Sequence, residues 1–438
     1  MSAEQELITF AVAQRWFGAK TRNVIHAEIV ERAVLRETAP ELVVQLVELR
    51  YETGTHDTYQ LVTSDTLDAL GDPASVRELA HMIRAGVRVP GLQGVVEFGS
   101  AEGFVGAGNE LREARVIDAE QSNTSVVFDD ELILKVFRRL SAGINPELEL
   151  LRFLTEKGFA NIAQLAGWYS YSGGPIDATL GIMQQYVAGG LDGWGLALDT
   201  MGDGDGGVLP LLRRLGEVTG QMHALLGSEQ EDPTFRPEET SVESLALLTA
   251  TVDEEIERVF LDLAEDNREL DVIRGRGEEV RERLRLLSSI GGAGRVIRHH
   301  GDFHLGQTLW ADGDWVIIDF EGEPARPLPE RRRKRSPLRD VAGLLRSLAY
   351  AASASSLLHG VEPPDGWEEQ ARSEFLAGYL ATVDQSLVPS GAALGKLLAV
   401  FELEKAVYEL NYELNNRPDW VSIPVAGIAR MLEEAVPA

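Results

Sequence analysis

The chain contains no cysteine, so it can form no disulfide, no thiolate metal site and no cysteine nucleophile. Basic residues are also scarce: 41 Lys and Arg stand against 70 Asp and Glu, which gives a formal net charge of −29. This balance argues against general binding to nucleic acid or an anionic membrane, because the attraction to phosphate has the wrong sign. No apolar run approaches the length of a membrane span, and no basic segment precedes an apolar core at the N-terminus. We therefore expect a cytoplasmic protein that binds neither nucleic acid nor membranes.

The patterning predicts an α+β chain of several subdomains, since 438 residues exceed one ordinary compact unit. Alternating apolar and polar positions predict strands, and spacing near 3.6 residues predicts helices. The predicted strands are 24–35, 41–52, 58–65, 94–100, 113–120, 125–130 and 132–140, followed by one within 178–195; the predicted helices are 4–17, 74–85 and 143–158, with helical spacing from 208 to 290 and from 337 to 437. We divide the chain into a β-rich part (1–90), an intermediate part (91–190) and a helical part (191–438).

A short polar loop, "HGDFHLGQ" at 300–307, precedes the apolar run that ends in "IIDFEGEP" at 317–324. Phosphoryl transfer from ATP needs a carboxylate that orients the attacking hydroxyl and oxygen ligands that hold Mg²⁺. Asp302 and Gln307 have the spacing of the kinase catalytic loop, with Gln in place of Asn. Asp319 ends a strand-like run where a second metal ligand would lie, and Glu321 is close enough in sequence to assist.

Upstream residues complete this pattern. Lys135 lies in a strand-like run, and Glu147 or Glu149 follows on the predicted helix, as in the lysine–glutamate pair that holds ATP phosphates. The segment "IMQQYV" at 182–187 stands where a hinge would join two lobes, so its backbone is a candidate to bind adenine. Each signal is weak alone, but the five occur in the order that a kinase requires.

Other interpretations remain open at this point. His300, Asp302 and His304 could wrap a zinc ion, since their spacing in a loop allows it. The segment "DTMGDGDGGV" at 199–208 lacks the twelfth-position Glu of a calcium loop, so we predict a flexible linker. No glycine-rich G-x-G-x-x-G precedes Lys135; the segment "AEQSNTSVVFDDEL" at 119–132 offers amides and hydroxyls instead, Ser125 among them. This absence, and that of an A-P-E segment, disfavours a protein kinase.

With these motifs in hand, the chain resembles the aminoglycoside-phosphotransferase-like kinases, and within them the actinobacterial maltokinase group with its related glucosamine kinases. The resemblance runs almost end to end, through "QRWFGAK" (14–20), "NPELEL" (145–150), "RSPLRDVAGLLRS" (335–347) and "YELNYELNNRPDW" (408–420). It implies a protein-kinase-like bilobal fold with an added N-terminal cap, and phosphorylation of a small sugar with ATP and Mg²⁺.

Carried over by position, the resemblance implies a role for each residue of the pattern. Asp302 is the catalytic base, and Gln307 and Asp319 are the Mg²⁺ ligands. Lys135 contacts phosphate, and Glu149 is favoured as its partner. The remaining expected nucleotide contacts are Ser125, Gln184, Tyr186 and Val187.

The sugar site is expected on the helical segment 408–420. Glu409, Tyr412 and Asn416 share a helix face, with Trp420 just beyond its end. The full set expected to border the sugar is Asp302, His304, Glu409, Asn411, Tyr412, Asn416 and Trp420. With Glu413 also facing this pocket, the predicted site is acidic, which suits a cationic amino sugar better than a neutral one. Phosphorylation of glucosamine is therefore the leading hypothesis, and the family resemblance implies its 6-hydroxyl as the acceptor. Maltose 1-phosphorylation is the alternative.

Two further classes of protein are disfavoured by the sequence. An aminoglycoside-resistance enzyme shares the catalytic loop but not the "RWFGAK" and "YELNNRPDW" segments, and a pseudokinase would lack one of the catalytic or metal-binding residues. The basic run "RRRKR" at 331–335 is interpreted as a solvated loop paired with nearby acids, and the alternative is that it helps to hold nucleotide or an acidic product. "RWFGAK" is interpreted as a packing element between cap and lobe, and the alternative is that it reaches the sugar pocket. We expect a monomer.

Overall fold

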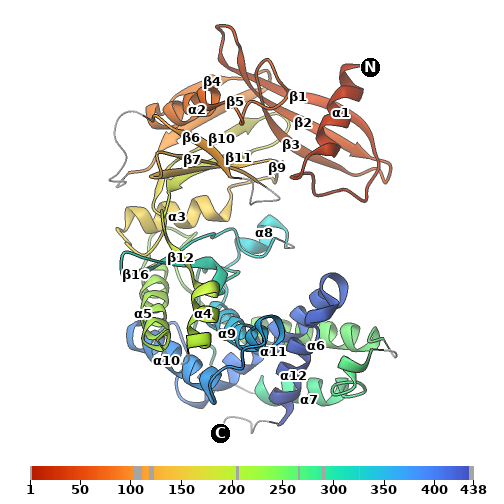
Figure 1. Ribbon diagram of the computed structural model, residues 1–438, viewed down its shortest axis with the longest axis vertical. Coiled ribbons are helices and arrows are strands. Elements are labelled where there is room, and N and C mark those ends of the chain that lie inside the picture. Colours follow the sequence, from red (N-terminus) through yellow and green to blue (C-terminus); the bar gives the residue numbers. More distant parts are fainter. Residues whose placement is uncertain are drawn as a thin grey trace. The chain divides into compact units, whose positions relative to one another are not determined.

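The computed structural model describes residues 2–102, 111–117, 123–203, 207–264, 267–288, 292–324 and 326–433. The chain forms two compact units, which Figure 1 shows coloured along the sequence. The first unit holds residues 1–189 and 326–330, and the second holds 190–325 and 331–438. The first unit spans both N-terminal parts of the predicted three-part division, and the boundary between those parts at residue 90 stays a prediction.

Two antiparallel sheets make up most of the first unit, as the alternating patterns predict. Their strand orders are β1-β2-β3-β9 and β4-β5-β10-β11-β8-β7-β6. The strands are β1 Val24–Arg36, β2 Leu42–Tyr51, β3 His56–Thr63, β4 Arg88–Pro90, β5 Gly94–Ser100, β6 Ala114–Ile117, β7 Asn123–Phe128, β8 Leu132–Phe137, β9 Arg139–Leu140, β10 Leu165–Gly173 and β11 Ala178–Gln185. The helices are α1 Ala3–Ala13, α2 Pro73–Ala85 and α3 Pro146–Glu156. Residues 118–120, predicted as the end of a strand, lie outside the described residues, and β10 was not predicted.

The "RWFGAK" segment packs into the core between α1 and the first sheet. Trp16 and Phe17 are buried, and their ring centroids lie 5.6 and 5.7 Å from that of Tyr59 on β3. The guanidinium of Arg138 also stacks over the Trp16 ring. The aromatic side chains of this motif are thus part of a hydrophobic core, as the packing interpretation predicts.

The second unit is mostly helical and carries two small antiparallel sheets, β12-β15-β16 and β13-β14. Its strands are β12 Leu191–Asp192, β13 Glu238–Glu239, β14 Arg295–Val296, β15 Thr308–Ala311 and β16 Asp314–Ile317. Its α-helices are α4 Gly193–Asp203, α5 Leu209–Leu226, α6 Val242–Leu261, α7 Gly277–Leu287, α9 Leu338–His359, α10 Trp367–Thr382, α11 Ala392–Asn416 and α12 Ser422–Glu433; α8 Leu328–Arg331 and the short 3₁₀ turns η1 Arg268–Leu270, η2 Leu305–Gln307 and η3 Pro418–Trp420 complete the list.

One prediction about this unit was wrong. The expected flexible linker at 199–208 is helical through residue 203, because the apolar spacing of 193–201 continues into it and Ala197 and Met201 are buried. Residues 204–206 of that segment lie outside the described residues.

A hydrophobic core holds α6, α7, α11 and α12 together, with Ile256, Leu284, Leu410 and Ile428 fully buried. Helix α9 packs against α11, so both are fixed where they border the loop 300–307. Among the described residues, none of the helices combines the length and apolar character needed to cross a membrane.

Candidate active site

The loop 300–307 is held by a buried carboxylate from the start of α9. Asp340 is 2% exposed and accepts hydrogen bonds from the amides of His300 (2.8 Å) and Gly301 (2.9 Å). His223 on α5 contacts the same carboxylate through Nε2 at 3.1 Å. Burial alone would raise the pKa of Asp340, but the imidazoles of His299 and His223 lower it below its usual value. Asp340 is therefore an ionised anchor that fixes the backbone just before Asp302.

His300 fixes the other side of the loop. Its Nε2 lies 2.9 Å from the Ile318 carbonyl, and its Nδ1 accepts from the Asp302 amide at 3.4 Å. The carbonyl requires the proton on Nε2, so the Nδ1 lone pair faces the loop itself. This arrangement ties the catalytic loop to the end of β16 and disfavours zinc binding by His300.

Gly343 on α9 lets the loop approach closely. A Cβ at this position would lie 2.6 Å from the Phe303 carbonyl oxygen, closer than such atoms approach one another. Helix α9 therefore lies against the backbone beside Asp302 because this residue has no side chain.

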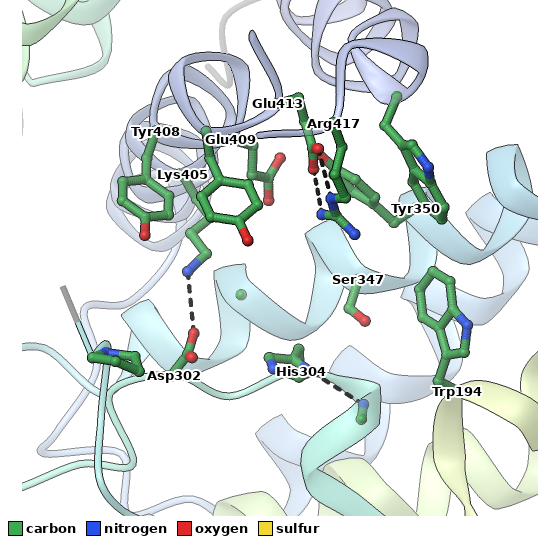
Figure 2. A pocket seen from close by; sticks show the side chains of 15 residues that line it. Trp194, Asp302, His304, Ser347, Tyr350, Lys405, Tyr408, Glu409, Glu413 and Arg417 are labelled. Atoms are coloured by element: carbon green, nitrogen blue, oxygen red, sulfur yellow. Dashed lines mark hydrogen bonds and ion pairs between the residues drawn. The ribbon is translucent and has the colours of Figure 1, made fainter. Parts of the chain in front are cut away.

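Asp302, the predicted base, lines a pocket and has a basic neighbour that was not predicted. Lys405 on α11 places Nζ 3.4 Å from Asp302 Oδ1 and 3.0 Å from Glu323 Oε1, as Figure 2 shows for the first pair. Burial would lower the pKa of this lysine, but Glu323 and Asp302 outweigh burial and raise it above its usual value. The lysine is therefore cationic and balances the carboxylates. Its position four residues before Glu409 on one helix could have indicated it.

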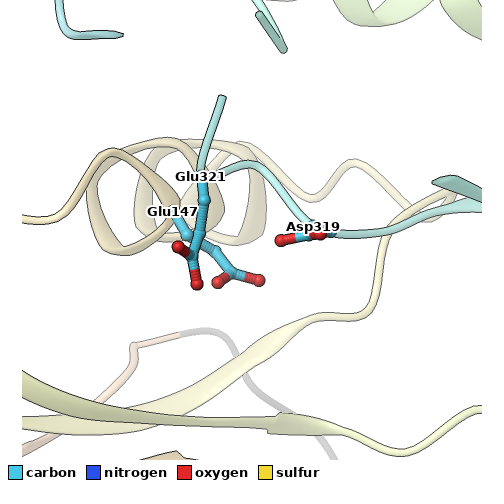
Figure 3. A group of neighbouring side chains, drawn as sticks. All are labelled: Glu147, Asp319 and Glu321. Carbon is cyan, nitrogen blue, oxygen red and sulfur yellow. The ribbon is translucent and has the colours of Figure 1, made fainter. Parts of the chain in front are cut away.

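The two predicted metal ligands come together. Gln307 Nε2 lies 3.1 Å from Asp319 Oδ2, although twelve residues separate them. Asp319 has φ +64°, a conformation that is uncommon outside glycine and recurs at functional sites. Glu321 follows on the same loop (Figure 3). Amide and carboxylate oxygens are the donors that Mg²⁺ accepts, so this set fits the ion.

In the first unit, Lys135 on β8 pairs with Glu147, not with Glu149. The Nζ–Oε1 distance is 3.0 Å, and Glu147 is fully buried on α3 (Figure 3). Asn145 caps α3 by accepting from the Glu147 amide at 2.8 Å, and Pro146 begins the helix. This helix N-cap fixes the first turn of α3 and therefore the position of Glu147. The expectation that Glu149 is the partner was wrong.

The residues predicted to contact the nucleotide differ in their burial and in their backbone hydrogen bonds. Ser125 pairs with Lys135 across β7 and β8, and both Ser125 and Gln184 are buried. The Tyr186 amide donates to the Glu131 carbonyl at 2.8 Å, so this amide is not available to an adenine ring. The nucleotide contact of Tyr186 stays a prediction. The structure records no backbone hydrogen bond for Val187 among the described residues.

A pocket of about 700 Å³ opens beside Asp302 (Figure 2). Its size lies within the range of small-molecule sites, about 300–1,000 Å³. It is lined by Trp194, Asp302, His304, Gly306, Pro324, Gly343, Ser347, Tyr350, Lys405, Tyr408, Glu409, Tyr412, Glu413, Arg417 and Trp420. Aromatic faces with carboxylates and hydroxyls between them are the groups that a carbohydrate site needs.

The carboxylates of this pocket have basic partners, which corrects the expectation of a simply acidic site. Arg346 Nε and Nη2 both bind Glu409 Oε2, at 3.0 and 2.8 Å. Arg417 pairs with Glu413 through both oxygens, and Tyr350 donates to the same carboxylate at 3.3 Å. Buried carboxylates require such partners. Both Arg346 bonds end on Oε2 of Glu409, and this residue lines the pocket.

His304 is a neutral donor at the pocket wall. Burial lowers the pKa of its imidazole, with Asp302 opposing this effect. Its Nδ1 accepts from the Gly306 amide at 3.1 Å, so the neutral ring carries its proton on Nε2. His304 can therefore donate one hydrogen bond to a ligand.

Two predicted sugar contacts do not line the pocket. The Asn411 side chain and carbonyl accept from Asn415, and the Asn416 side chain donates to the Tyr412 carbonyl. Glu409 and Asn411 lie about 200° apart around the helix, which places Asn411 away from the site. Tyr412 and Trp420 do line it, and Trp420 stacks with Tyr350 at 6.4 Å.

The buried His299 predicts a pH dependence of stability. Burial lowers the pKa of its imidazole from 6.5 to about 4. Between these values the unfolded chain binds a proton that the folded chain does not, so stability falls as the pH falls, by at most about 1.4 kcal/mol per pH unit. We expect His299→Asn to give a shallower loss of Tm between pH 7 and pH 5 than the parent chain. His56→Asn, at an exposed strand residue, is the control and keeps the parent slope. Equal slopes for His299→Asn and the parent would contradict this assignment.

Comparison with known proteins places the chain among the phosphotransferases. The model of the "Phosphotransferase enzyme family" matches residues 113–362, and that of the "Maltokinase N-terminal cap domain" matches residues 10–85. A glucosamine kinase of Mycolicibacterium smegmatis is 27% identical over 75% of this chain and 82% of its own length. One of Streptacidiphilus jiangxiensis is 26% identical over 76% of each chain.

Solved structures show the same fold. A glucosamine kinase structure (crystal form B) superposes with a TM-score of 0.75 at 23% identity, covering 96% of this chain and 97% of that chain. A glucosamine kinase in complex with glucosamine, ADP and inorganic phosphate also gives 0.75, at 22% identity and 96% and 98% coverage. The predicted kinase-like fold with an N-terminal cap and a helical C-terminal region is confirmed. The match at residues 113–362 covers more than half of this chain, so the chain belongs to the phosphotransferase enzyme family.

Proposed function

We propose that this chain is an ATP- and Mg²⁺-dependent sugar kinase that phosphorylates glucosamine on its 6-hydroxyl, with Asp302 as the base. The observation that carries the choice of sugar is Glu409. Arg346 holds one oxygen of its carboxylate, Oε2, and Glu409 lines the pocket that also contains Asp302. We assign the second oxygen, Oε1, as the acceptor for the sugar. The ammonium group of an amino sugar can donate a hydrogen bond to that second oxygen. Because a hydrogen bond between two charged groups is stronger than one to a neutral group, the site favours an amino sugar over a neutral sugar.

The chemistry is a single displacement. Asp302 orients the 6-hydroxyl of the sugar and accepts its proton. The hydroxyl oxygen forms a bond to the γ-phosphorus of ATP, while the bond between that phosphorus and the β,γ-bridging oxygen breaks and ADP leaves. Lys405 balances the charge of Asp302, and the neutral His304 donates to a sugar hydroxyl. Trp420, Tyr350 and Trp194 offer flat faces to the ring. Gln307 and Asp319 would hold Mg²⁺, which when bound supplies positive charge to the phosphates. In the first unit, Lys135 is the cation for the nucleotide phosphates, and Glu147 holds its ammonium in place.

Maltose is the second candidate, and the maltokinase cap match at residues 10–85 is the observation that favours it. Pocket size does not separate the two sugars, because about 700 Å³ admits either. The separating experiment measures ATP consumption by kcat/KM with glucosamine, maltose, glucose, N-acetylglucosamine and kanamycin. Preference for glucosamine supports the proposal. Turnover of maltose without turnover of glucosamine refutes it, and preference for kanamycin would assign an aminoglycoside phosphotransferase.

The role of Glu409 gives a specific prediction. Glu409→Gln removes the charge that binds the ammonium, so kcat/KM for glucosamine is expected to fall about 10- to 100-fold, as for loss of a charged hydrogen bond. Turnover of glucose, which has no amine, should change much less. Glu404→Gln is the matched control, since Glu404 lies on the same helix and pairs with an arginine, Arg339, but does not line the pocket. Equal losses on glucosamine and glucose would show that Glu409 only maintains the structure.

A further inference from the structure

The basic run at 331–335 builds a second pocket in the second unit. The pocket measures about 350 Å³ and is lined by Thr234, Glu238, Arg298, Arg332, Arg333 and Lys334. None of these residues lines the sugar pocket. The lining holds four basic side chains and one acid, a formal charge of +3, on a chain whose net charge is −29. The predicted pairing of this run with nearby acids is confirmed for Lys334 with Glu238 and for Arg331 with Glu321, and the pocket is a feature that this prediction did not include.

The two ends of the run have structural roles. Arg331 donates to the Glu321 carbonyl at 3.1 Å. Arg335 exchanges both backbone hydrogen bonds with Ile297, at 3.0 and 2.9 Å. These contacts fix one end of the segment to the loop that follows β16 and the other end beside β14, the strand that precedes the catalytic loop. The three residues between them, 332–334, are thereby held along the pocket.

The wall opposite the run is built as well. Arg298 is only 2% exposed, and its guanidinium lies 5.8 Å from the ring centroid of Phe235. Lys334 donates to the Pro233 carbonyl and to Glu238, so the one acid of the lining already has a cation as its partner. The other cations of the lining are three arginines, whose planar guanidinium groups match the oxygens of phosphate.

We propose that this pocket binds a phosphate dianion, either inorganic phosphate or the phosphate group of a small phosphomonoester. Three arginines around one cavity suit a compact ligand with two charges. The volume lies at the lower end of the range for small-molecule sites, about 300–1,000 Å³. The strongly acidic remainder of the chain disfavours a polyanion such as nucleic acid. Arg298 lies four residues before Asp302, so a bound phosphate rests against the segment that leads into the catalytic loop.

The test is calorimetric titration of the full chain with inorganic phosphate and, separately, with glucosamine 6-phosphate. Arg332→Gln/Arg333→Gln is expected to weaken the phosphate binding of this site by about tenfold or more, as for loss of two charge-assisted contacts. The matched control is Arg276→Gln/Arg285→Gln, which removes the same charge from a half-buried residue just before α7 and an exposed residue on it, and it should change binding less than about twofold. Both variants should keep the parent kcat.

The outcomes separate cleanly. Equal affinity for inorganic phosphate and glucosamine 6-phosphate supports a site that contacts only the phosphate group. Tighter binding of glucosamine 6-phosphate supports a sugar phosphate as the ligand. Equal binding by the two double variants, or no binding to the parent chain, overturns the proposal. If the double variant does not fold, Arg333→Gln alone, at an exposed position, must still weaken binding. The inorganic phosphate titration needs no sugar turnover, so its failure is distinct from failure of the proposed kinase activity.

Discussion

Replacing Asp302 by asparagine is expected to lower kcat by about 10²- to 10⁴-fold, the usual contribution of a general base. Asparagine keeps the shape of the side chain but cannot accept the hydroxyl proton. The loop itself should persist, because its anchors are backbone amides bound to Asp340 and the ring of His300. Lys405 keeps a partner in Glu323 at 3.0 Å. The loss should therefore be chemical, with ADP affinity and Tm close to those of the parent.

Steady-state kinetics with glucosamine and calorimetric titration with ADP check this prediction together. Asp365→Asn, at an exposed residue outside the sugar pocket, is the control and should leave kcat unchanged. Turnover like the parent's in Asp302→Asn would remove Asp302 from the role of base. A parallel loss of ADP binding would mean that the residue holds the site together instead.

The catalytic loop was predictable from sequence because its function depends on short spacings. Asp302 and Gln307 lie five residues apart, and Asp319 lies two residues after the end of β16. A short hairpin therefore brings Asp319 to Gln307. The partner of Lys135 was not predictable in the same way. Glu147 and Glu149 lie about 200° apart on their helix, so only one can face the sheet, and the sequence does not give the helix its rotation.

The sugar pocket shows the same limit. Its carboxylates were foreseen, but their partners come from residues far away in sequence: Arg346 on α9 for Glu409, and Lys405 on α11 for Asp302. Hydrogen bonds within a helix also removed Asn416 from the expected site, since its side chain donates to the Tyr412 carbonyl. The anchor Asp340 lay in a segment already noted for its resemblance, yet only the fold shows its contact with the loop.

The buried pair of Lys135 and Glu147 gives the second large effect. Lys135→Met leaves a fully buried carboxylate without its lysine, and breaking such a pair costs about 3–5 kcal/mol. We expect a marked fall in Tm and loss of kinase turnover. Arg213→Met, which breaks the exposed pair with Glu374, is the control and should cost about 1 kcal/mol or less.

The double variant Lys135→Met/Glu147→Leu separates stability from function. Apolar side chains of similar size often replace a buried ion pair at little cost, so Tm should return to near the parent value. Turnover should not return, because an apolar pair offers no charge to the nucleotide phosphates. Recovery of both Tm and turnover would mean that the pair is purely structural. Recovery of neither would mean that the site, between the interior strand β8 and α3, cannot repack. Only the split result, stable but inactive, supports the role in nucleotide binding.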